Sequence, residues 1–238
     1  MNLTLPPREE KAVAVQGMFS AIAPRYDLLN HLLSLNIDKL WRRRAIDILL
    51  SNKSPAGQYL DACTGTMDLA VEIAKRRSFS GSVLASDFAY PMMAAGRHKI
   101  PGKRITMACG DAMRLPCRDN QFDGACVGFG IRNVASVNDG IRELVRVLRP
   151  GGRLVILEFT TPLWQPFRGM YLSYFKHVLP TIGKLISKHG SAYSYLPASV
   201  LEFPEPPALG AIMESAGLHD VKWETRTGGI VAIHSGTK

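Results

Sequence analysis

The sequence predicts an α/β fold in which a mostly parallel, doubly wound sheet is covered by helices on both faces. From about residue 57 onward, short apolar segments typical of strands alternate with segments of helical periodicity. One apolar segment ends in Asp61 and is followed by a loop of small polar residues, a helix and a second apolar segment that ends in Asp87. The spacing between these two acids is about what one strand–helix–strand crossover requires. Such a unit is one half of a nucleotide-binding fold.

With 238 residues, the chain has room for one large core, and we expect a single domain spanning residues 1–238. Residues 8–50 carry apolar positions at helical spacing and predict a helical N-terminal extension, broken at Pro24 and ending a second run near Asn36. The remaining parts are a cofactor-binding core (57–160), a substrate-side helical insertion (161–205) and a closing helix with two strands (206–238).

The periodicity locates the individual elements. Strands are expected at 58–62, 82–86, 104–109, 123–128, 153–159, 219–225 and 229–235. Helices are expected at 68–77, 90–98, 137–148 and 207–216, and we interpret 149–152 as a turn that ends a helix and starts a strand. In an open parallel sheet, ligands bind beyond the carboxyl ends of the strands. We therefore expect one pocket formed by the 61–68 loop, Asp87, Gly110 to Ala112, the 128–133 loop and Glu158 onward.

Composition indicates an ordinary globular protein of the cytoplasm. Hydrophobic residues make up 46% and charged residues 21% of the chain, with no apolar run long enough to span a membrane. The N-terminus lacks the apolar core of a signal peptide. The four cysteines (63, 109, 117 and 126) form no CxxC pair, so we expect reduced, buried thiols and no metal site.

The net charge of +9 suits nucleic acid, an anionic membrane surface or solubility alone. Its densest clusters are Trp41–Arg44 and Lys75–Arg77, and no nucleic-acid-binding motif accompanies them. Membrane attraction is therefore the better functional interpretation, with a solvated helix face as the open alternative. Residues 163–190 interleave aromatic residues with Lys and His, which suits either a helix at a lipid interface or a core helix with one solvated face.

The loop after Asp61 has an incomplete glycine pattern. A full Gly-x-Gly-x-Gly would place glycine at 63, 65 and 67, where this chain has Cys63, Gly65 and Met67. The glycines alone leave a plain strand-to-helix turn open, but the placement between two strands and the acid at Asp87 favour an adenosine-containing cofactor. A nicotinamide-dependent dehydrogenase lacks support, because no full G-x-G-x-x-G is present.

Longer motifs are more specific. They are Arg25-Tyr-Asp-Leu-Leu-Asn30 followed by Trp41-Arg-Arg, then Phe129-Gly-Ile-Arg-Asn-Val134, then Val147 to Phe159, and finally Ser191 to Ser199. Through these motifs the chain resembles the ubiquinone/menaquinone biosynthesis C-methyltransferases, a branch of the class I, Rossmann-like S-adenosylmethionine-dependent methyltransferases. The resemblance implies a seven-stranded sheet with an antiparallel last strand and S-adenosylmethionine as cofactor. It also implies a polyprenylated quinol substrate, which suits peripheral association with the inner face of the membrane; a homo-oligomer stays open.

The same resemblance assigns roles to individual residues. Asp61, Thr64, Gly65 and Thr66 would lie at the methionine end of the cofactor, Asp87 at the ribose, and Asp111 and Ala112 near the adenine. Arg132 and Asn133 would face the ring to be methylated, with Tyr26 as a neighbour. Because a guanidinium stays protonated, Arg132 is no base; it would hold a phenolate or orient a water that takes the proton, while Asn133 fixes the geometry. The candidates for a direct base, all weak, are Asp27, His31 and His177, and Asp27 has a second interpretation as a pin for the N-terminal helices.

Met67 departs from the family pattern, which has glycine at this position. If the position needs a positive φ, a side chain costs about 1–2 kcal/mol there. Three outcomes stay open: the loop binds weakly, the side chain turns away, or activity is lost. Two alternative functions follow, a methyltransferase of the same fold acting on another lipid or small aromatic, and a non-catalytic cofactor- or quinone-binding relative disabled at Met67.

Overall fold

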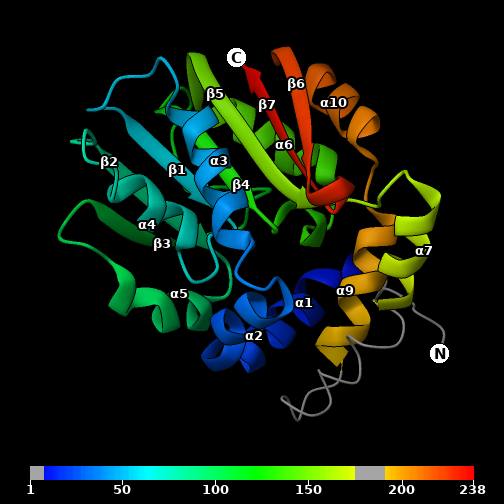
Figure 1. Ribbon diagram of the computed structural model, residues 1–238. Coiled ribbons are helices and arrows are strands. Elements are labelled where there is room, and N and C mark those ends of the chain that lie inside the picture. The colour runs from blue at the N-terminus through cyan, green and yellow to red at the C-terminus, as the bar shows by residue number, and fades with distance from the viewer. Residues whose placement is uncertain (1–7, 175–190) are drawn as a thin grey trace.

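The computed structural model describes residues 8–174 and 191–238, which form one seven-stranded sheet flanked by helices (Figure 1). The strand order is β3-β2-β1-β4-β5-β7-β6. The neighbours among β1 to β5 pair in parallel, whereas β7 runs antiparallel to both β5 and β6. The predicted mostly parallel sheet with an antiparallel last strand is therefore confirmed.

The elements lie close to their expected positions. The strands are β1 (Gln58–Ala62), β2 (Ser82–Asp87), β3 (Ile105–Cys109), β4 (Phe122–Gly128), β5 (Leu148–Phe159), β6 (His219–Arg226) and β7 (Val231–Thr237). The helices that accompany them are α3 (Asp38–Leu50), α4 (Asp68–Ala74), α5 (Tyr90–Gly96), α6 (Val137–Val147) and α10 (Pro206–Ser215).

Both faces of the sheet are buried, as parallel strands require. Successive residues of β1 point to opposite faces, so Tyr59 joins a core with α3 and α4, and Leu60 joins a second core with α6 and α10. The first core contains Ile46 of α3 and Ile73 of α4. This two-sided packing leaves the carboxyl ends of the strands as the place where polar side chains gather.

The segment 149–152 differs from the expected turn. Phe122 of β4 pairs with Leu148 and Gly124 with Arg153, so the four residues between them loop out of a strand that has already begun. They stay tied to the sheet because the Gly151 N–H donates to the carbonyl of Lys238 at 2.6 Å. Gly151 has φ +77°, which a residue with a side chain rarely adopts. The segment is thus a bulge inside β5.

The N-terminal extension forms three helical pieces before α3, namely α1 (Arg8–Ile22), the 3-10 turn η1 (Ala23–Arg25) and α2 (Tyr26–Leu33). Pro24 lies in η1, and Asn36 adopts a left-handed conformation (φ +63°) after α2, so both expected breaks are confirmed. Of these pieces, α1 lies beside α9 (Ser191–Glu202) (Figure 1), and its Met18 and Ile22 pack in one cluster with Tyr171 of α7 (Gln165–Ser173). Residues 175–190, including His177, lie outside the described residues. Within the described ranges, no helix is both long and apolar enough to cross a bilayer.

Candidate functional site

A pocket opens beyond the carboxyl ends of β1 to β4, and it encloses about 900 Å³ of space not filled by atoms, part of it open to solvent. The residues that line it are Asp61, Cys63 to Thr66, Asp68, Leu69, Asp87, Phe88, Gly110 to Met113, Gly128 to Gly130 and Asn133 to Ala135, with Ala12, Phe19, Tyr26, Arg42 and Met92 from the flanking helices. The expected convergence of strand ends is therefore confirmed for β1 to β4 but not for the end of β5 at Glu158. Arg132 and Glu158 are buried beside this pocket without lining it.

Asp61, at the end of β1, is buried in the wall of the pocket. Its Oδ2 accepts hydrogen bonds from Thr64 Oγ1 at 2.5 Å and from the Ala70 N–H at 2.9 Å. Burial raises the pKa of this carboxyl group to about 7, against the lowering effect of the two hydrogen bonds, and the charges of Asp68 and Asp87 raise it further. A cation bound in the pocket would therefore favour the ionised form of Asp61.

Asp87, at the end of β2, holds the loop that follows β1. One oxygen accepts the Gly65 N–H and the other accepts the Ala89 N–H, both at 2.8 Å. Burial raises the pKa of the carboxyl group in spite of these bonds. A carboxylate has about four acceptor sites, so further oxygen lone pairs remain for a hydroxyl in the pocket. The neighbouring strand end contributes Asp111, whose Oδ1 accepts the Met113 N–H at 2.9 Å, and Ala112.

Met67 adopts the left-handed conformation that favours glycine (φ +67°, ψ 26°). Its side chain is fully buried in the core with Ile73 and does not line the pocket. Burying a Met side chain contributes about 1.5–3 kcal/mol, which offsets the backbone cost of about 1–2 kcal/mol. Of the three outcomes considered for this position, the side chain turns away from the pocket.

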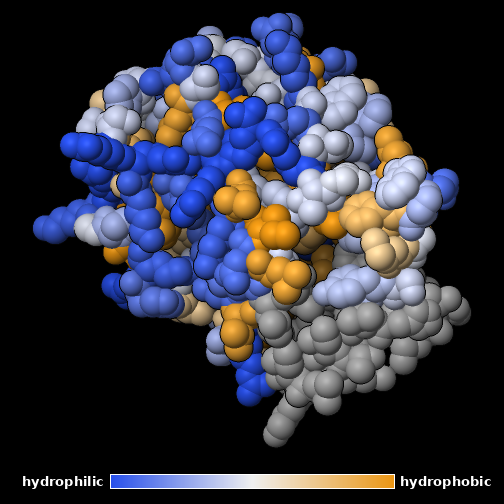
Figure 2. Space-filling model, in the orientation of Figure 1, coloured by the Kyte–Doolittle hydropathy of each residue, from blue (hydrophilic) through white to orange (hydrophobic). Residues whose placement is uncertain are grey.

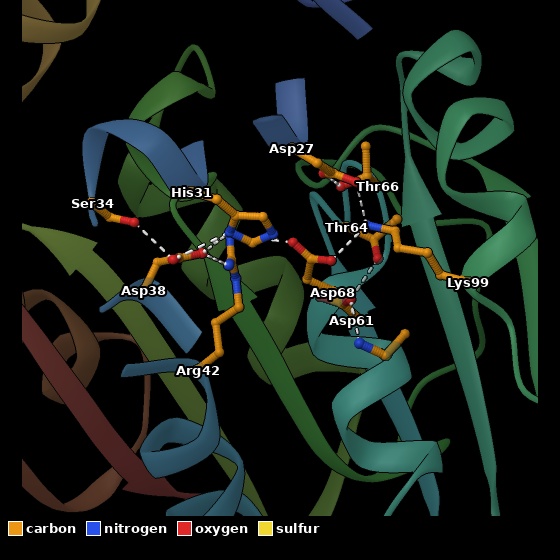
Figure 3. Close-up of polar contacts among 11 residues, drawn as sticks. Asp27, His31, Ser34, Asp38, Arg42, Asp61, Thr64, Thr66, Asp68 and Lys99 are labelled. Atoms are coloured by element: carbon orange, nitrogen blue, oxygen red, sulfur yellow. Dashed lines mark hydrogen bonds and ion pairs between the residues drawn. The ribbon is translucent and has the colours of Figure 1, made fainter. Parts of the chain in front are cut away.

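Polar contacts tie the N-terminal helices to the loop of residues 61–68, the expected cofactor loop (Figure 3). Asp27 of α2 accepts a hydrogen bond from Thr66 Oγ1 at 2.5 Å and forms an ion pair with Lys99 Nζ at 2.8 Å, while Lys99 also contacts Asp68 at 2.5 Å. Although burial raises the pKa of Asp27, the contacts with Lys99 and Thr66 lower it below its usual value. Asp27 therefore anchors α2 to the loop and to Lys99, and it is a poor general base.

Tyr26, one residue earlier, borders the pocket from the same helix. Its ring meets that of Phe19 edge-on, with ring centroids 6.0 Å apart. Burial raises the pKa of the Tyr26 hydroxyl, so the group stays protonated at neutral pH. A Cβ added to Gly65 (φ +55°) would lie 4.0 Å from the Tyr26 ring, so the ring lies directly over the cofactor loop.

The same network continues into α3. Arg42 forms ion pairs with Asp38 and, at 3.3 Å, with Asp68, and Asp38 is also 3.0 Å from His31 Nδ1 (Figure 3). The interpretation of Trp41–Arg44 as a surface cluster is therefore wrong for its first half, because Trp41 and Arg42 are buried. His31 does not line the pocket, and its partnership with Asp38 gives it a structural role.

Arg132 and Asn133 lie in η3 (Ile131–Asn133), directly after β4. Arg132 Nη1 donates to the Phe129 carbonyl at 2.5 Å and to Glu158 Oε2 at 2.8 Å. Asn133 Nδ2 donates to the same carbonyl at 3.3 Å, whereas its Oδ1 is buried without a hydrogen-bond partner in the described part of the chain. Asn133 is among the residues that line the pocket, and this oxygen is left as an unpaired acceptor beside it.

Sequence reasoning missed two residues that hold η3. Glu158 was expected to help form the pocket; it does not line the pocket and instead pairs with Arg132. Lys11 of α1 donates to the carbonyl oxygens of Arg132 and Val134 at 3.0 and 2.9 Å. The signal for Glu158 was an acid at the end of a buried strand, and a lone lysine in the first helix gave no signal.

The cysteines are all free thiols, of which Cys126 is buried and Cys63 and Cys117 are partly buried. The expectation of buried thiols is wrong for Cys109, which is exposed because it ends the edge strand β3. Burial raises the pKa of the Cys63 and Cys126 thiols well above the usual value, so both stay protonated. In the described residues, no group of three or more His, Cys, Asp or Glu side chains is placed to hold a metal ion.

The sheet order, the antiparallel β7 and the pocket at the strand ends define a class I methyltransferase fold. A solved S-adenosylmethionine-dependent methyltransferase from Thermotoga maritima matches with a TM-score of 0.65 and 18% identity, covering 93% of this chain and 99% of that one. A phosphoethanolamine N-methyltransferase from Haemonchus contortus matches with a TM-score of 0.60 and 16% identity, over 83% of this chain and 52% of that one. At these identities the likeness shows the fold alone.

Sequence comparison identifies the family. The family model of the ubiE/COQ5 methyltransferases matches residues 7–238. A ubiquinone/menaquinone biosynthesis C-methyltransferase from Geobacter sulfurreducens is 45% identical over 241 residues, covering 100% of this chain and 93% of the relative. A demethylmenaquinone methyltransferase from Thermus thermophilus is 48% identical over 223 residues, covering 93% of this chain and 100% of the relative. The chain belongs to the ubiE/COQ5 methyltransferase family, and the resemblance seen in its motifs is confirmed.

Proposed function

We propose that the protein is an S-adenosylmethionine-dependent C-methyltransferase that methylates the ring of a demethylated menaquinol or of a ubiquinol precursor in quinone biosynthesis. The observation that carries this proposal is the pocket with three acids at adjacent strand ends in a chain of this family. The names of the relatives support a quinone-type substrate. The alternative of a non-catalytic relative disabled at Met67 loses its main support, because the Met67 side chain is buried in the core and does not obstruct the pocket.

The residues of the pocket suit this cofactor. Asp61 would face the ammonium group of the methionine moiety, Asp87 would accept the ribose hydroxyls, and Asp111 and Ala112 would lie near the adenine. Thr64 and Thr66 already use their hydroxyl groups to hold Asp61 and Asp27, so this loop would contact the cofactor mainly through its backbone, with Gly65 at the closest approach. When bound, the cofactor supplies a methyl group activated by its sulfonium.

The remaining tasks of the enzyme are to align an electron-rich ring carbon, to stabilise a ring oxygen as its proton leaves, and to exclude water. The guanidinium cation of Arg132 would stabilise the phenolate or orient a water molecule. The unpaired Asn133 Oδ1 would accept a hydrogen bond from that water or from the ring hydroxyl. Because Asp27 is ion-paired with Lys99 and His31 is held by Asp38 outside the pocket, we assign the proton to an oriented water molecule.

The apolar tail of the substrate would leave the site between α7, α9 and the N-terminal helices. A hydrophobic cluster there contains Tyr171 and Val200, with Met18 and Ile22 of α1 packed against it. Hydrophobic residues interrupt the otherwise hydrophilic surface on the face shown in Figure 2. Leu163 and Trp164, just before α7, are 75% and 70% exposed. Such side chains support peripheral contact with a membrane, which sedimentation with anionic and neutral vesicles would test.

The experiment that tests the function has two stages. Calorimetric titration with S-adenosylmethionine and with NAD should give micromolar binding of the first alone, and Asp87→Ala should abolish that binding. Asp220→Asn, at an exposed position on β6, is the matched loss of one carboxylate and should leave the affinity unchanged. Turnover of demethylmenaquinol should then exceed that of a small catechol. Tight cofactor binding without transfer to any quinol would contradict the proposal and favour a non-catalytic relative.

A further inference from the structure

The short helix η3, which carries Arg132, is held by Lys11 of α1 through backbone carbonyl oxygens and by one carboxylate, Glu158 of β5, which alone of the two binds the Arg132 side chain. Glu158 Oε1 accepts the backbone N–H of Arg132 at 3.2 Å, and Oε2 accepts its guanidinium Nη1 at 2.8 Å. We propose that Glu158 is a positioning residue for methyl transfer, which acts by holding the guanidinium of Arg132 in one orientation beside the substrate ring. The inference rests on the proposed function, because it requires Arg132 to act in catalysis.

The environment of Glu158 supports this role over a purely structural one. The carboxylate is 1% exposed and lies near the end of β5, at the same edge of the sheet as the pocket. An unpaired charge at such a position would be strongly destabilising, and Arg132 supplies the cation, with the Phe159 N–H as a further donor at 3.2 Å. An apolar residue would fill the same space without this requirement, so the core alone gives no reason for an acid there.

The guanidinium is bracketed on three sides. Glu158 and the Phe129 carbonyl share Nη1, and the Phe159 ring lies with its centroid 5.4 Å from the guanidinium carbon. Because the guanidinium is planar, fixing Nη1 also fixes the direction of its other N–H groups. Nε is buried without a partner in the described part of the chain, as is the hydroxyl of Tyr195 on α9. Arg132 therefore keeps an unused donor at Nε, and Glu158 helps to set the direction of that donor.

The positioning of Arg132 by Glu158 can be tested separately from cofactor binding. The cofactor loop is held by Asp61 and Asp87 on β1 and β2, whereas Glu158 accepts its hydrogen bonds from Arg132 and Phe159. Releasing Arg132 would thus misplace the group that stabilises the ring oxygen while the cofactor pocket stays intact. A displacement of about 1 Å at such a group costs about 100-fold in rate in well-positioned sites. The expected signature is a fall in kcat with an unchanged cofactor affinity.

The first test compares Glu158→Gln with Glu143→Gln. The control carboxylate on α6 has the same kind of partners, the Leu115 N–H at 2.7 Å and the Arg146 guanidinium at 2.8 Å, but lies away from the pocket. In Glu158→Gln, the amide places a donor against an existing donor, so one of the two bonds to Arg132 is lost. We expect kcat with demethylmenaquinol to fall about tenfold or more, with the dissociation constant of S-adenosylmethionine within about twofold of wild type. The control should change neither quantity, and an unchanged kcat in Glu158→Gln would overturn the proposal.

A double-mutant cycle separates failure of this inference from failure of the proposed function. If Glu158 acts through Arg132, then Glu158→Gln should cause no further loss of kcat in an Arg132→Ala background. Additive losses would show that Glu158 acts independently and would overturn the inference. If Arg132→Ala alone keeps full kcat, the catalytic role of Arg132 itself is wrong.

Glu158→Asp covers the case in which the amide variant does not fold. This variant keeps the charge but withdraws the carboxylate by about 1.5 Å, one carbon–carbon bond. A fall in kcat with normal cofactor binding would support positioning. Wild-type kcat would overturn it, and so would loss of folding in both Glu158 variants.

Discussion

Replacing Asp61 with asparagine should stabilise the cofactor-free protein, and the gain should grow with pH. Burial raises the pKa of Asp61 from 3.8 to about 7, so the folded state binds a proton that the unfolded state releases. The stability of the wild-type protein therefore falls as the pH rises from 3.8 to about 7, by about 1.4 kcal/mol per pH unit, and is level above that range. Asparagine is uncharged throughout. The advantage of Asp61→Asn over wild type should thus increase by about 2 kcal/mol between pH 5 and pH 7.

The geometry accommodates the amide. Its oxygen can take the place of Oδ2, which accepts hydrogen bonds from Thr64 and Ala70, and its NH₂ group then faces the Cys126 sulfur, 3.9 Å from Oδ1. Urea unfolding of both proteins without cofactor, at pH 5, 6, 7 and 8, measures the difference. For a domain of this size, about 2 kcal/mol corresponds to about 4–8 °C in Tm.

Asp220→Asn is the control for the loss of one negative charge at an exposed position, and its effect should not vary over this pH range in the same way. A difference between Asp61→Asn and wild type that is the same at pH 5 and pH 8 would refute the reasoning. So would a variant that is less stable than wild type at pH 8. The same substitution should cost cofactor binding, since the destabilising carboxylate is the group assigned to the ammonium.

Three further predictions concern the cofactor pocket. The affinity of wild-type protein for S-adenosylmethionine should rise by up to about tenfold per pH unit between pH 5.5 and 7 and then level off, because a cation selects the ionised form of Asp61. A calorimetric affinity that does not change with pH would contradict the assignment of Asp61 to the ammonium group. Met67→Gly should lower the free energy of unfolding by about 1–3 kcal/mol, since the lost core packing of about 2–5 kcal/mol exceeds the relief of backbone strain, while cofactor affinity stays within about threefold. A large gain in affinity would mean that Met67 obstructs the site after all. Lys99→Met leaves Asp27 and Asp68 without their shared cation. Cofactor affinity should then fall at least about fivefold, and proteolysis within α1 and α2 should accelerate. Unchanged rates of cleavage would show that these ion pairs do not hold the helices.

The fold was predictable from the sequence because its determinants are local. Each strand is a short apolar run, and the acids at 61 and 87 mark where two of them end. The bulge at 149–152 was not predictable in the same way. Its Pro-Gly-Gly sequence is typical of a turn, and the hydrogen bonds of Gly151 and Gly152 with Lys238, at the far end of the chain, keep it within the sheet. The local sequence indicates that the backbone can turn sharply there, but pairing with a distant strand decides whether the segment forms a turn or a bulge in the sheet.

The site was predictable where its residues follow strands and unpredictable where they come from elsewhere. Topology alone brings Asp61, Asp87 and Asp111 to one edge of the sheet. By contrast, the ties from Lys99 to Asp27 and from Lys11 to the carbonyl oxygen of Arg132 join segments far apart in the chain, and their charges look like those of any solvated helix.

The conformation of Met67 could not be judged from sequence for a related reason. A positive φ makes glycine the expected residue, but the cost of a side chain there depends on where its Cβ points. In this fold the Met67 side chain packs in the core with residues of α4. The replacement of glycine by methionine therefore adds a buried side chain to the core and does not disrupt the cofactor loop. The free energy that decides the matter, about 1.5–3 kcal/mol of burial against about 1–2 kcal/mol of strain, belongs to the tertiary structure. A missing glycine in such a loop is therefore evidence against cofactor binding only when the new side chain faces the pocket.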